Sequence, residues 1–358
     1  MDLPFLLLAC LGAVAAFALA FRGEGAWADR WRRALRALAA LGAIVAAGRF
    51  AFFVSTWLPA DSPANSYDFK VFYDYALIAR TWGPIYDLES IRGDPGTIVV
   101  YRHAPIGAGL FVPWTLLPYH AALNAGRLLN VGLYVGTLWT LLRPFHLSPR
   151  EPLALGLAAL WFASTPSRDS LALGQWDALF LNLGLAALIL FTTRRDRDFL
   201  VGALLALPIA LKFFPALLLL APLVARRWRV FAGCAAGGLA TILLGVLLAG
   251  PRNTWVFLTQ VLPAVGGGTL YAENQTLYAF IGRLLATHLA GNGVGATYPV
   301  DQTRLLADAV AVPLVLLTAL VAWRRGGGEL AAALRFALPI PVALLVIPTA
   351  WAHYCALA

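Results

Sequence analysis

A group of polar side chains that lie in or beside apolar segments of this chain could carry out chemistry. The candidates are Asp68, Arg102, His103, Lys212, Asn274, Gln275, Arg283 and His353. One carboxylate among several cations suits the removal of a proton from a hydroxyl group while an anionic group leaves. The carboxylate would act as a general base, and the cations would stabilise the charge that grows on a departing phosphate.

Several of these residues also have a structural interpretation. Asp68 stands just before a predicted helix and could cap it, because aspartate is favoured at that position. Lys212 lies between Pro208 and Pro215 in an apolar segment, where an ammonium group without a partner is costly. It therefore serves either a functional site or a structural ion pair or carbonyl contact. His103 could simply anchor the chain at the membrane interface.

Two further residues leave alternatives open, and two kinds of site are not predicted. His353 lies beside Trp351 and Tyr354 and could belong to an aromatic belt. Gln175 follows Gly174 and could cap a helix. The five histidines show no metal-ligand spacing, so no metal site is predicted. The sequence has no glycine-rich phosphate loop, so neither a nucleotide-sugar donor nor a cofactor is expected.

The composition is that of a membrane protein. Hydrophobic residues make up 60% of the 358 residues and charged residues 13%, against about 25% charged residues in a soluble domain. Apolar stretches of about 20 residues match the thickness of the hydrocarbon core. They are continuous rather than alternating, which predicts helices and excludes a barrel. The predicted fold is an all-α, polytopic transmembrane helical bundle.

The net charge of +9 comes almost wholly from arginine. The arginines cluster in short loops beside apolar segments, where the positive-inside rule places them on the cytoplasmic side. Membrane lipids are therefore expected partners, and nucleic acid is not.

The alternation of these clusters predicts the topology of a single transmembrane domain over residues 1–358. Residues 1–36 would form an extra N-terminal helix and a basic cytoplasmic loop, and residues 59–104 and 250–303 would form two extracytoplasmic loops. The predicted crossings are residues 3–21, 37–58, 119–142, 152–165, 171–193, 230–249, 305–323 and 330–351. Residues 105–117 are too short to cross and are predicted to form a half-helix. Residues 199–225 carry arginines at both ends, which predicts a re-entrant hairpin of two half-helices.

The first outer loop contains a predicted amphipathic helix. Its apolar positions follow the i, i+3, i+4, i+7, i+8 pattern: Phe69, Phe72, Tyr73, Ala76 and Leu77. This aromatic face is expected to lie in the membrane interface. Asp74, on the polar face, is expected to be a solvated charge.

Several motifs together resemble a known family. They are Tyr67-Asp68-Phe69 with Gly83-Pro84-Ile85-Tyr86-Asp87, Tyr101-Arg102-His103-Ala104-Pro105 with Pro113 and Leu117-Pro118, Leu173-Gly174-Gln175, Ala210-Leu211-Lys212-Phe213-Phe214-Pro215, Glu273-Asn274-Gln275 with Arg283, and Trp351-Ala352-His353-Tyr354. In order and spacing they are similar to those of glycosyltransferase family 87, the polyprenol-phosphate-mannose-dependent transferases of the GT-C superfamily. Ala104 replaces one proline of the family's aromatic-Pro-Pro segment.

The resemblance implies a GT-C-like bundle in the bacterial plasma membrane, with the active site on the extracytoplasmic side. It implies that Asp68 is the general base, that a polyprenyl phosphate carries the sugar donor, and that the anomeric carbon is inverted. On this hypothesis the chain transfers a hexose, expected to be mannose, to a lipid or glycan acceptor. The residues expected to bind the donor phosphate are Lys212, Arg102, His103, Arg283 and His353. Those expected to orient sugar hydroxyls are Gln175, Asn274 and Gln275.

Two other functional classes are compatible with the composition. A transporter or lipid flippase would share the broken helix and the charge at membrane depth. It predicts an internal repeat with charges at mid-membrane in both halves, whereas the polar residues here are predicted to gather at one face. A non-catalytic scaffold of the cell envelope would tolerate alanine at Asp68 and Lys212.

Overall fold

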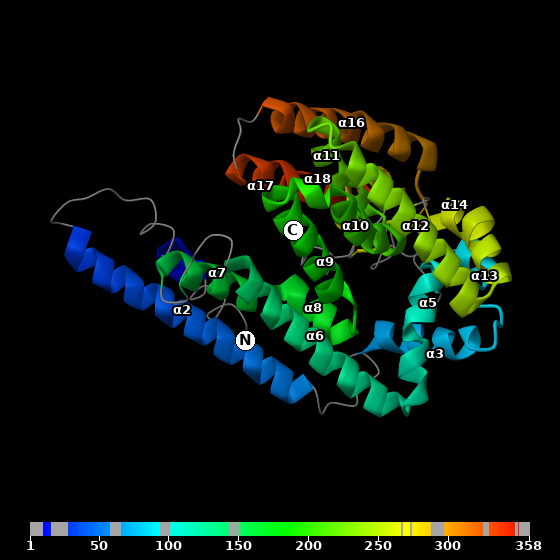
Figure 1. Cartoon of the computed structure of the whole chain (residues 1–358), viewed down its shortest axis with the longest axis horizontal. Coiled ribbons are helices and arrows are strands. Elements are labelled where there is room, and N and C mark those ends of the chain that lie inside the picture. Colours follow the sequence, from blue (N-terminus) through cyan, green and yellow to red (C-terminus); the bar gives the residue numbers. More distant parts are fainter. Residues whose placement is uncertain are drawn as a thin grey trace. The chain divides into compact units, whose positions relative to one another are not determined.

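In the computed structural model of the chain (Figure 1), every regular element is a helix within the residues that the structure describes. Those residues are 10–15, 28–57, 66–93, 101–142, 148, 151–265, 268–272, 274–287, 297–324, 329–347 and 350. The predicted all-α fold is therefore confirmed. The chain forms two compact units, which alternate along the sequence. The first comprises Met1–Tyr67 and Asn124–Ala178, and the second comprises Asp68–Leu123 and Leu179–Ala358.

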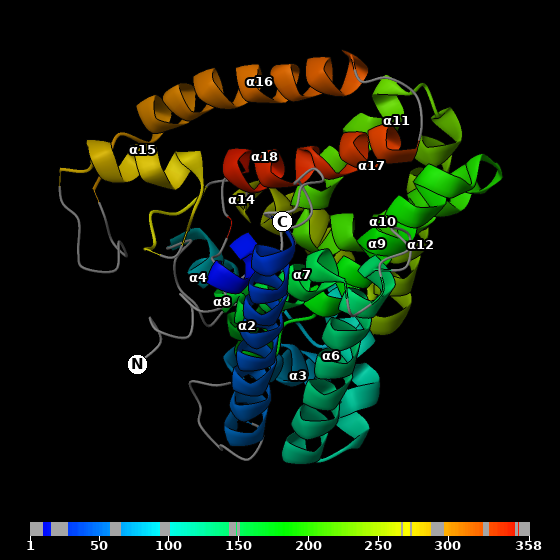
Figure 2. The ribbon, with the colours of Figure 1, turned by 90° about the vertical axis from the view of Figure 1, so that its left-hand side faces the viewer.

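Three helices of the described segments are long and apolar enough to cross a membrane. They are residues Ala34–Thr56 of α2 (Ala28–Trp57), α12 (Trp228–Ala249) and residues Val300–Trp323 of α16 (Val300–Arg324). The chain is thus a multi-pass membrane protein. In Figure 2, α16 runs alongside α18 (Pro339–Val346), with which it is in contact. The helix α2 begins at Ala28, so the arginines from Arg30 to Arg36 lie on it and not in the predicted loop.

Other predicted crossings are divided into shorter helices. Residues 152–165 form α7 (Pro152–Ala163), and residues 171–193 fall on α8 (Thr165–Leu173) and α9 (Asp177–Thr193). Residues 330–351 include α17 (Glu329–Ala337) and α18. Each of these helices is shorter than the ~20 residues that a full crossing needs. As predicted for residues 105–117, α5 (Pro105–Phe111) and η1 (Val112–Leu116) form a short segment, bent by 116° from α6 (Tyr119–Leu142).

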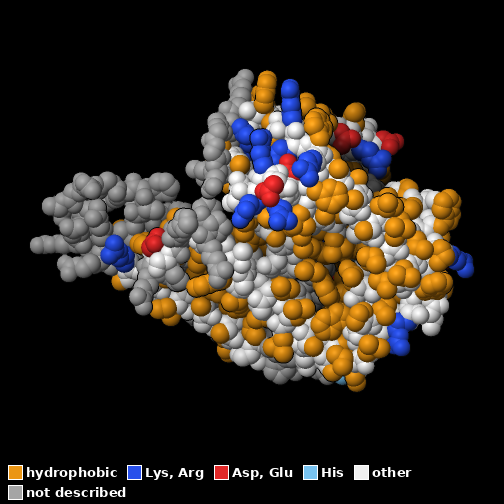
Figure 3. Space-filling model, in the orientation of Figure 1, with side chains coloured by type: hydrophobic (Ala, Val, Ile, Leu, Met, Phe, Trp, Pro, Cys, Tyr) orange, Lys and Arg blue, Asp and Glu red, His pale blue; other side chains and the backbone are white. Residues whose placement is uncertain are grey.

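Large apolar side chains lie exposed on the helices of membrane-spanning length. On α12 they include Leu239, Ile242, Leu243, Leu244 and Leu247. On α16 they include Leu305, Val312, Leu316, Leu317 and Trp323. Contiguous apolar surface of this kind indicates contact with lipid. Figure 3 shows hydrophobic side chains over much of the visible face and a group of basic side chains in the upper part of the view.

The first unit is built on α2 and α7, which pack along each other. The rings of Phe50 and Tyr134 lie 5.4 Å apart, and that of Phe162 lies 5.2 Å from Phe50. Tyr134 and Trp161 stack at 4.7 Å and exchange hydrogen bonds, each donating to the other's backbone carbonyl. These contacts fix α6 to α7 through paired amphipathic aromatics, whose polar groups need partners when buried.

In the second unit, α10 (Asp198–Lys212) and α12 pack backbone to backbone. A Cβ atom on Gly202 would lie 1.8 Å from the carbonyl oxygen of Val230, and one on Gly233 would lie 1.9 Å from that of Phe199. No side chain fits at either position, so glycine is what allows the two helices to approach this closely.

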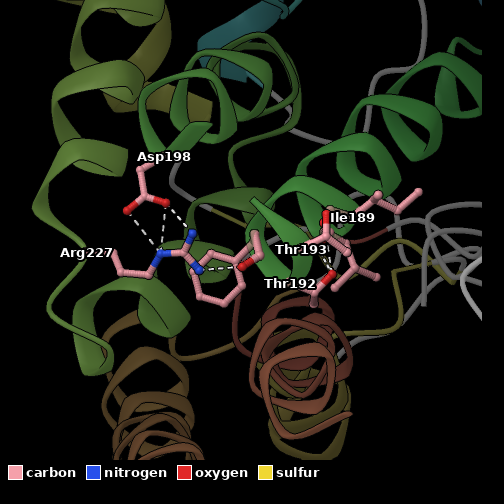
Figure 4. Close-up of polar contacts among 7 residues, drawn as sticks. Ile189, Thr192, Thr193, Asp198 and Arg227 are labelled. Atoms are coloured by element: carbon pink, nitrogen blue, oxygen red, sulfur yellow. Dashed lines mark hydrogen bonds and ion pairs between the residues drawn. The ribbon is translucent and has the colours of Figure 1, made fainter. Parts of the chain in front are cut away.

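The segment that follows α10 turns back and returns to the end from which α10 started. The helix ends at Lys212, and Phe213 takes the left-handed φ of 56°. The chain then forms η3 (Phe214–Leu219) and α11 (Leu220–Val224) and reaches Arg227. The Arg227 guanidinium donates to both carboxylate oxygens of Asp198 at the start of α10, and to the Phe191 carbonyl (Figure 4). Both ends of the segment meet there, so the segment is a hairpin, and its re-entrant insertion into the membrane stays a prediction.

The arginines at this end of the hairpin form an exposed basic group around the buried ion pair. They are Arg194, Arg195, Arg197, Arg226 and Arg229. Arg195 and Arg197 lie on η2 (Arg195–Arg197). Lys212 lies at the opposite end of α10, about 22 Å away for 15 residues of helix. Lys212 therefore lies at the turn of the hairpin, far from the basic group.

The two predicted outer loops are joined to each other at Asn253. The first contributes α3 (Tyr67–Ala79) and α4 (Leu88–Gly93). The second contributes α13 (Pro251–Val256), the π-helical turn η4 (Phe257–Val261), α14 (Leu262–Val265) and α15 (Leu277–Leu285). The buried Asn253 amide donates to the carbonyls of Gly83 and Ala249 at 2.8 and 2.7 Å, and accepts from the backbone N–H of Ile85 at 3.2 Å.

Replacing Asn253 with alanine should lower the free energy of unfolding by roughly 1–3 kcal/mol, because buried backbone groups would lose their partners. The thermal midpoint in detergent measures this change. Asn124, which is exposed, provides the matched control: its replacement with alanine should change the midpoint little. Equal effects of the two substitutions would show that Asn253 does not hold the loops together.

Candidate active site

Asp68 lies in the first turn of α3, which begins at Tyr67. Asp68 is therefore the second residue of the helix, and the prediction that it is the N-cap, the residue just before the helix, is wrong. A carboxylate in the first turn is favoured by the helix dipole, and Asp68 is half-buried. Asp74 forms an exposed pair with Lys70 at 2.5 Å, as expected of a solvated charge on the polar face.

The apolar face of α3 packs against protein. Phe69, Phe72, Tyr73 and Ala76 are buried as the periodicity predicted, but Leu77 is 42% exposed and Ala79 is buried in its place. The Phe69 ring contacts those of Phe111, Trp114 and Tyr119, with centroids 5.3 to 6.4 Å apart. The expectation that this face lies in the membrane interface is thus wrong. The α5–η1 segment covers it instead, and so fixes the helix that carries Asp68.

His103 links α3 to the turn of the re-entrant hairpin. Its ring stacks on Phe72 at 5.0 Å and meets the edge of Tyr101 at 5.7 Å. Its Nδ1 atom lies 3.3 Å from the carbonyl oxygen of Leu211. Phe72 is one helical turn beyond Asp68, and Leu211 directly precedes Lys212. The histidine therefore brings the aspartate helix and the lysine end of α10 to the same place.

Two tyrosines that the sequence argument did not select hold His103 in position. The Tyr86 hydroxyl donates to the His103 carbonyl at 2.8 Å, and the Tyr101 hydroxyl donates to the Ala104 carbonyl at 2.9 Å. Burial raises the pKa of both tyrosines well above the ordinary value, so both hydroxyls remain protonated donors. A Cβ atom on Gly107 would lie 2.5 Å from the Tyr101 hydroxyl, so α5 approaches that ring through a glycine.

Asn274 and Gln275 lie on the loop that leads into α15, and Arg283 lies in the last turn of that helix. The fully buried Asn274 donates from Nδ2 to the Thr269 carbonyl at 2.7 Å, and its Oδ1 accepts from the backbone N–H of Ala350 at 2.9 Å. Gln275 donates its backbone N–H to the Ala350 carbonyl at 2.8 Å, while its side chain is exposed. Arg283 donates to the carbonyls of Tyr271 and Asn274 at 3.2 and 3.1 Å, and burial lowers its pKa.

The same loop is connected to the hairpin turn. Ala350, which Asn274 and Gln275 hold, packs with Phe214, Ala343 and Leu344 in one apolar cluster. Phe214 lies two residues beyond the buried Lys212. The Asn274 loop and the His103 segment therefore both attach to the end of α10, through Phe214 and Leu211 respectively.

The remaining candidates are placed less directly. Arg102 is half-buried beside His103. Gln175 belongs to the first unit: it is buried, it follows the left-handed Gly174, and its backbone N–H donates to the Ser170 carbonyl at 3.0 Å. His353 lies outside the described residues, although Ala350 is placed three residues before it.

The site is rich in cations and aromatic rings and poor in metal ligands. Within the described ranges, no three His, Cys, Asp or Glu side chains gather as a metal ion would require. The residues that gather at the end of α10 instead suit an anion, since a lysine ammonium offers donors and positive charge.

Comparison with known proteins agrees with this chemistry. The model of glycosyltransferase family 87 matches residues 101–356. The chain belongs to glycosyltransferase family 87. The match covers most of the chain, including His103, Lys212, the Asn274 loop and the position of His353. It begins after Asp68, so the role of Asp68 stays a prediction from the motif Tyr67-Asp68-Phe69.

Two relatives of this family 87 protein act on lipid-linked mannosides. A polyprenol-phosphate-mannose-dependent alpha-(1-2)-phosphatidylinositol pentamannoside mannosyltransferase of Mycolicibacterium smegmatis is 27% identical over 295 residues, which is 81% of this chain and 67% of that protein. The corresponding phosphatidylinositol mannoside mannosyltransferase of Mycobacterium tuberculosis is 26% identical over 303 residues, 78% of this chain and 66% of that protein. This chain thus spans about two thirds of their length. No solved structure matches the chain at a comparable significance.

Proposed function

We propose that this family 87 glycosyltransferase transfers mannose from a polyprenyl-phosphate donor to a lipid-linked glycan acceptor, with inversion. The observation that carries the proposal is the contact between His103 and the Leu211 carbonyl. This contact brings His103 to the residue before Lys212, beside the helix whose first turn carries Asp68. A donor whose phosphate is attached to a membrane-embedded chain must be met at the membrane.

In the proposed reaction, an acceptor hydroxyl attacks the anomeric carbon of the donor sugar. The bond between that carbon and the phosphate oxygen breaks, and the polyprenyl phosphate leaves with the electron pair. Asp68 takes the proton of the attacking hydroxyl. A single displacement of this kind inverts the anomeric carbon.

The proposed roles of the other residues follow from their places. Lys212 and His103, with Arg102, stabilise the departing phosphate, and Arg283 and His353 complete the positive surroundings. The exposed Gln275 amide orients sugar hydroxyls, and the same role for Gln175 stays a prediction from the sequence. Both the nitrogen and the oxygen of the Asn274 side-chain amide form hydrogen bonds with backbone groups. We therefore propose that Asn274 contributes by positioning Gln275 and the segment before His353.

The proposed orientation places the site on the extracytoplasmic side. It is supported by the exposed arginines at the opposite end of the hairpin, which the positive-inside rule assigns to the cytoplasm.

The test of the function is transfer of radiolabelled mannose by the purified chain in vesicles. The donor is polyprenyl phosphate mannose, and the first acceptors are phosphatidylinositol mannosides, the class on which the two relatives act. Label should move from the donor to the acceptor lipid. Failure of transfer from every polyprenyl-phosphate sugar, by folded protein, would refute the proposal.

Replacing Lys212 with methionine should lower kcat by on the order of a hundredfold, because one preorganised cation that faces the leaving group is lost. Methionine fills the buried site without burying a charge, and the thermal midpoint in detergent checks that the fold persists. The chain provides a matched control in Lys70, its only other lysine, which is exposed and paired with Asp74. Lys70→Met should leave kcat within about twofold of the original value. Equal losses in the two variants would assign Lys212 a structural role.

A further inference from the structure

The end of the hairpin far from the proposed site carries an excess of positive charge. Six arginines and two aspartates lie in residues 194–198 and 226–229. Asp198 is paired with Arg227, and Asp196 lies 3.5 Å from Arg197. The four other arginines are all exposed: Arg194, Arg195, Arg226 and Arg229. None of these four forms an ion pair or a side-chain hydrogen bond with another residue that the structure describes. Their guanidinium groups are therefore open to an anion from outside the chain.

Arg226 occupies a position where glycine is the usual residue. It follows the end of α11, and its φ is 53°. The backbone N–H groups of Arg226 and Arg227 donate to the carbonyls of Leu223 and Pro222 at 3.0 and 2.9 Å, which is the Schellman ending of a helix. A side chain is unfavourable in this left-handed conformation, which glycine adopts freely. Because the turn would form more easily with glycine, the contribution of Arg226 lies in its side chain.

The surroundings of Arg226 place it at the level of lipid head groups. Trp228 is the first residue of the membrane-spanning helix α12; it is 60% exposed, and its ring lies 5.7 Å from that of Phe231. Three more exposed apolar side chains lie at this end, on α10 and α11: Phe199, Leu200 and Leu223. Arginine beside tryptophan at the end of a span is typical of the membrane–water interface. A soluble acidic protein or a nucleic acid would leave the apolar side chains in water, whereas a lipid covers them with its acyl chains.

We propose that Arg226, with the three other open arginines, binds the phosphate of an anionic phospholipid in the leaflet at this end of the hairpin. Guanidinium groups form paired hydrogen bonds with phosphate oxygens, and the excess positive charge favours a head group with a net negative charge. The site adjoins the Arg227–Asp198 pair that joins the two ends of the hairpin. A head group bound there stabilises the closed hairpin by mass action. This proposal does not depend on the transfer reaction.

The first test is the thermal midpoint of the full chain in lipid nanodiscs. Discs of phosphatidylcholine are compared with discs in which phosphatidylglycerol replaces part of that lipid. The midpoint should be about 3 °C higher in the mixed discs. Sodium phosphate or soluble polyglutamate, added to phosphatidylcholine discs at matched ionic strength, should leave the midpoint unchanged. An equal rise with either of them would assign the arginines to a soluble anion and overturn the proposal.

Two substitutions of Arg226 separate the charge from the backbone. Arg226→Gln removes the charge but keeps a side chain in the left-handed conformation, whereas Arg226→Gly removes both. In phosphatidylcholine discs, Arg226→Gly should raise the midpoint by about 2 °C, and Arg226→Gln should leave it unchanged. In both variants the gain from phosphatidylglycerol should fall to about half of the original gain. A gain that persists in full in both variants would refute the role of Arg226.

Arg252 provides the matched control. It is exposed on α13, beyond the opposite end of α12, and it forms no ion pair with another described residue. Arg252→Gln should keep most of the gain from phosphatidylglycerol. A loss equal to that of Arg226→Gln would show that total charge, and not this site, attracts the lipid.

A labelling experiment locates the lipid directly. Phosphatidylglycerol with a photoreactive group on its head group should label residues 223–229 in the mixed discs, and Arg226→Gln should weaken this labelling. Residues 251–256, at the other end of α12, should be labelled less. Absence of label on residues 223–229, in discs that raise the midpoint, would place the stabilising lipid elsewhere and overturn the proposal.

Discussion

Asp68→Asn should lower the rate of mannose transfer by on the order of a thousandfold, because the amide keeps the shape of the carboxyl group but cannot accept the proton of the attacking hydroxyl. The cost to the fold should be small. Asp68 lies in the first turn of α3, where the loss of a negative charge removes about 0.3–1 kcal/mol of helix-dipole stabilisation. The rate is measured as kcat with saturating donor and acceptor, and the fold by the thermal midpoint in detergent.

Asp74→Asn is the control for the aspartate prediction. Asp74 lies on the same helix, exposed and paired with Lys70, so its replacement changes the charge of α3 without touching the site. This variant should retain most of the activity. If Asp68→Asn kept more than a tenth of the activity, or if the two variants behaved alike, Asp68 would not be the base.

Arg227→Leu should lower the free energy of unfolding by about 3–5 kcal/mol, because it leaves the Asp198 carboxylate buried without its partner. Both side chains are less than a tenth exposed, and the guanidinium also lies 4.0 Å from the centre of the Phe191 ring. The prediction is checked by equilibrium unfolding in mixed detergent micelles. The transfer activity should fall as well, because the ion pair holds together the two ends of the hairpin that carries Lys212.

Two variants distinguish a broken ion pair from a general effect of removing an arginine. The double variant Asp198→Leu with Arg227→Leu should recover most of the lost stability, since replacing both charges with apolar groups is often neutral. Arg197 makes an exposed ion pair with Asp196 at 3.5 Å, and Arg197→Leu should change stability little. A double variant as unstable as Arg227→Leu would mean that packing, and not the uncompensated charge, is what matters.

The hairpin illustrates how much a charge pattern can predict. Arginines at both ends of residues 199–225 could not all be cytoplasmic if the segment crossed once, and two prolines near its middle allowed it to turn. In the structure, Arg227 and Asp198 form an ion pair that joins the two ends of the segment. The sequence did not reveal this ion pair, because the partners are 29 residues apart and nothing in either cluster distinguishes Arg227 from its neighbours.

The helix that carries Asp68 shows where periodicity stops being informative. The spacing of aromatic residues identified most of the buried face of α3, but not what covers it. Lipid and the α5–η1 segment are both apolar, so the same residues suit either surroundings. Leu77 was predicted to be buried, but Ala79 is buried instead. A small rotation of the helix decides which of two apolar side chains at the edge of the face is buried.

The sequence by itself determined the class of the molecule, because a chain with so few charges and such long apolar segments cannot cover a water-facing surface. It also determined most of the candidate cations, through motifs in the order typical of family 87. Only the tertiary structure decided that His103 meets Leu211, that Asn253 joins the two loops, and that Asn274 holds Ala350. Those hydrogen bonds connect residues 76 to 168 positions apart, and a partner at that separation leaves no local pattern by which a polar residue could be recognised as bound.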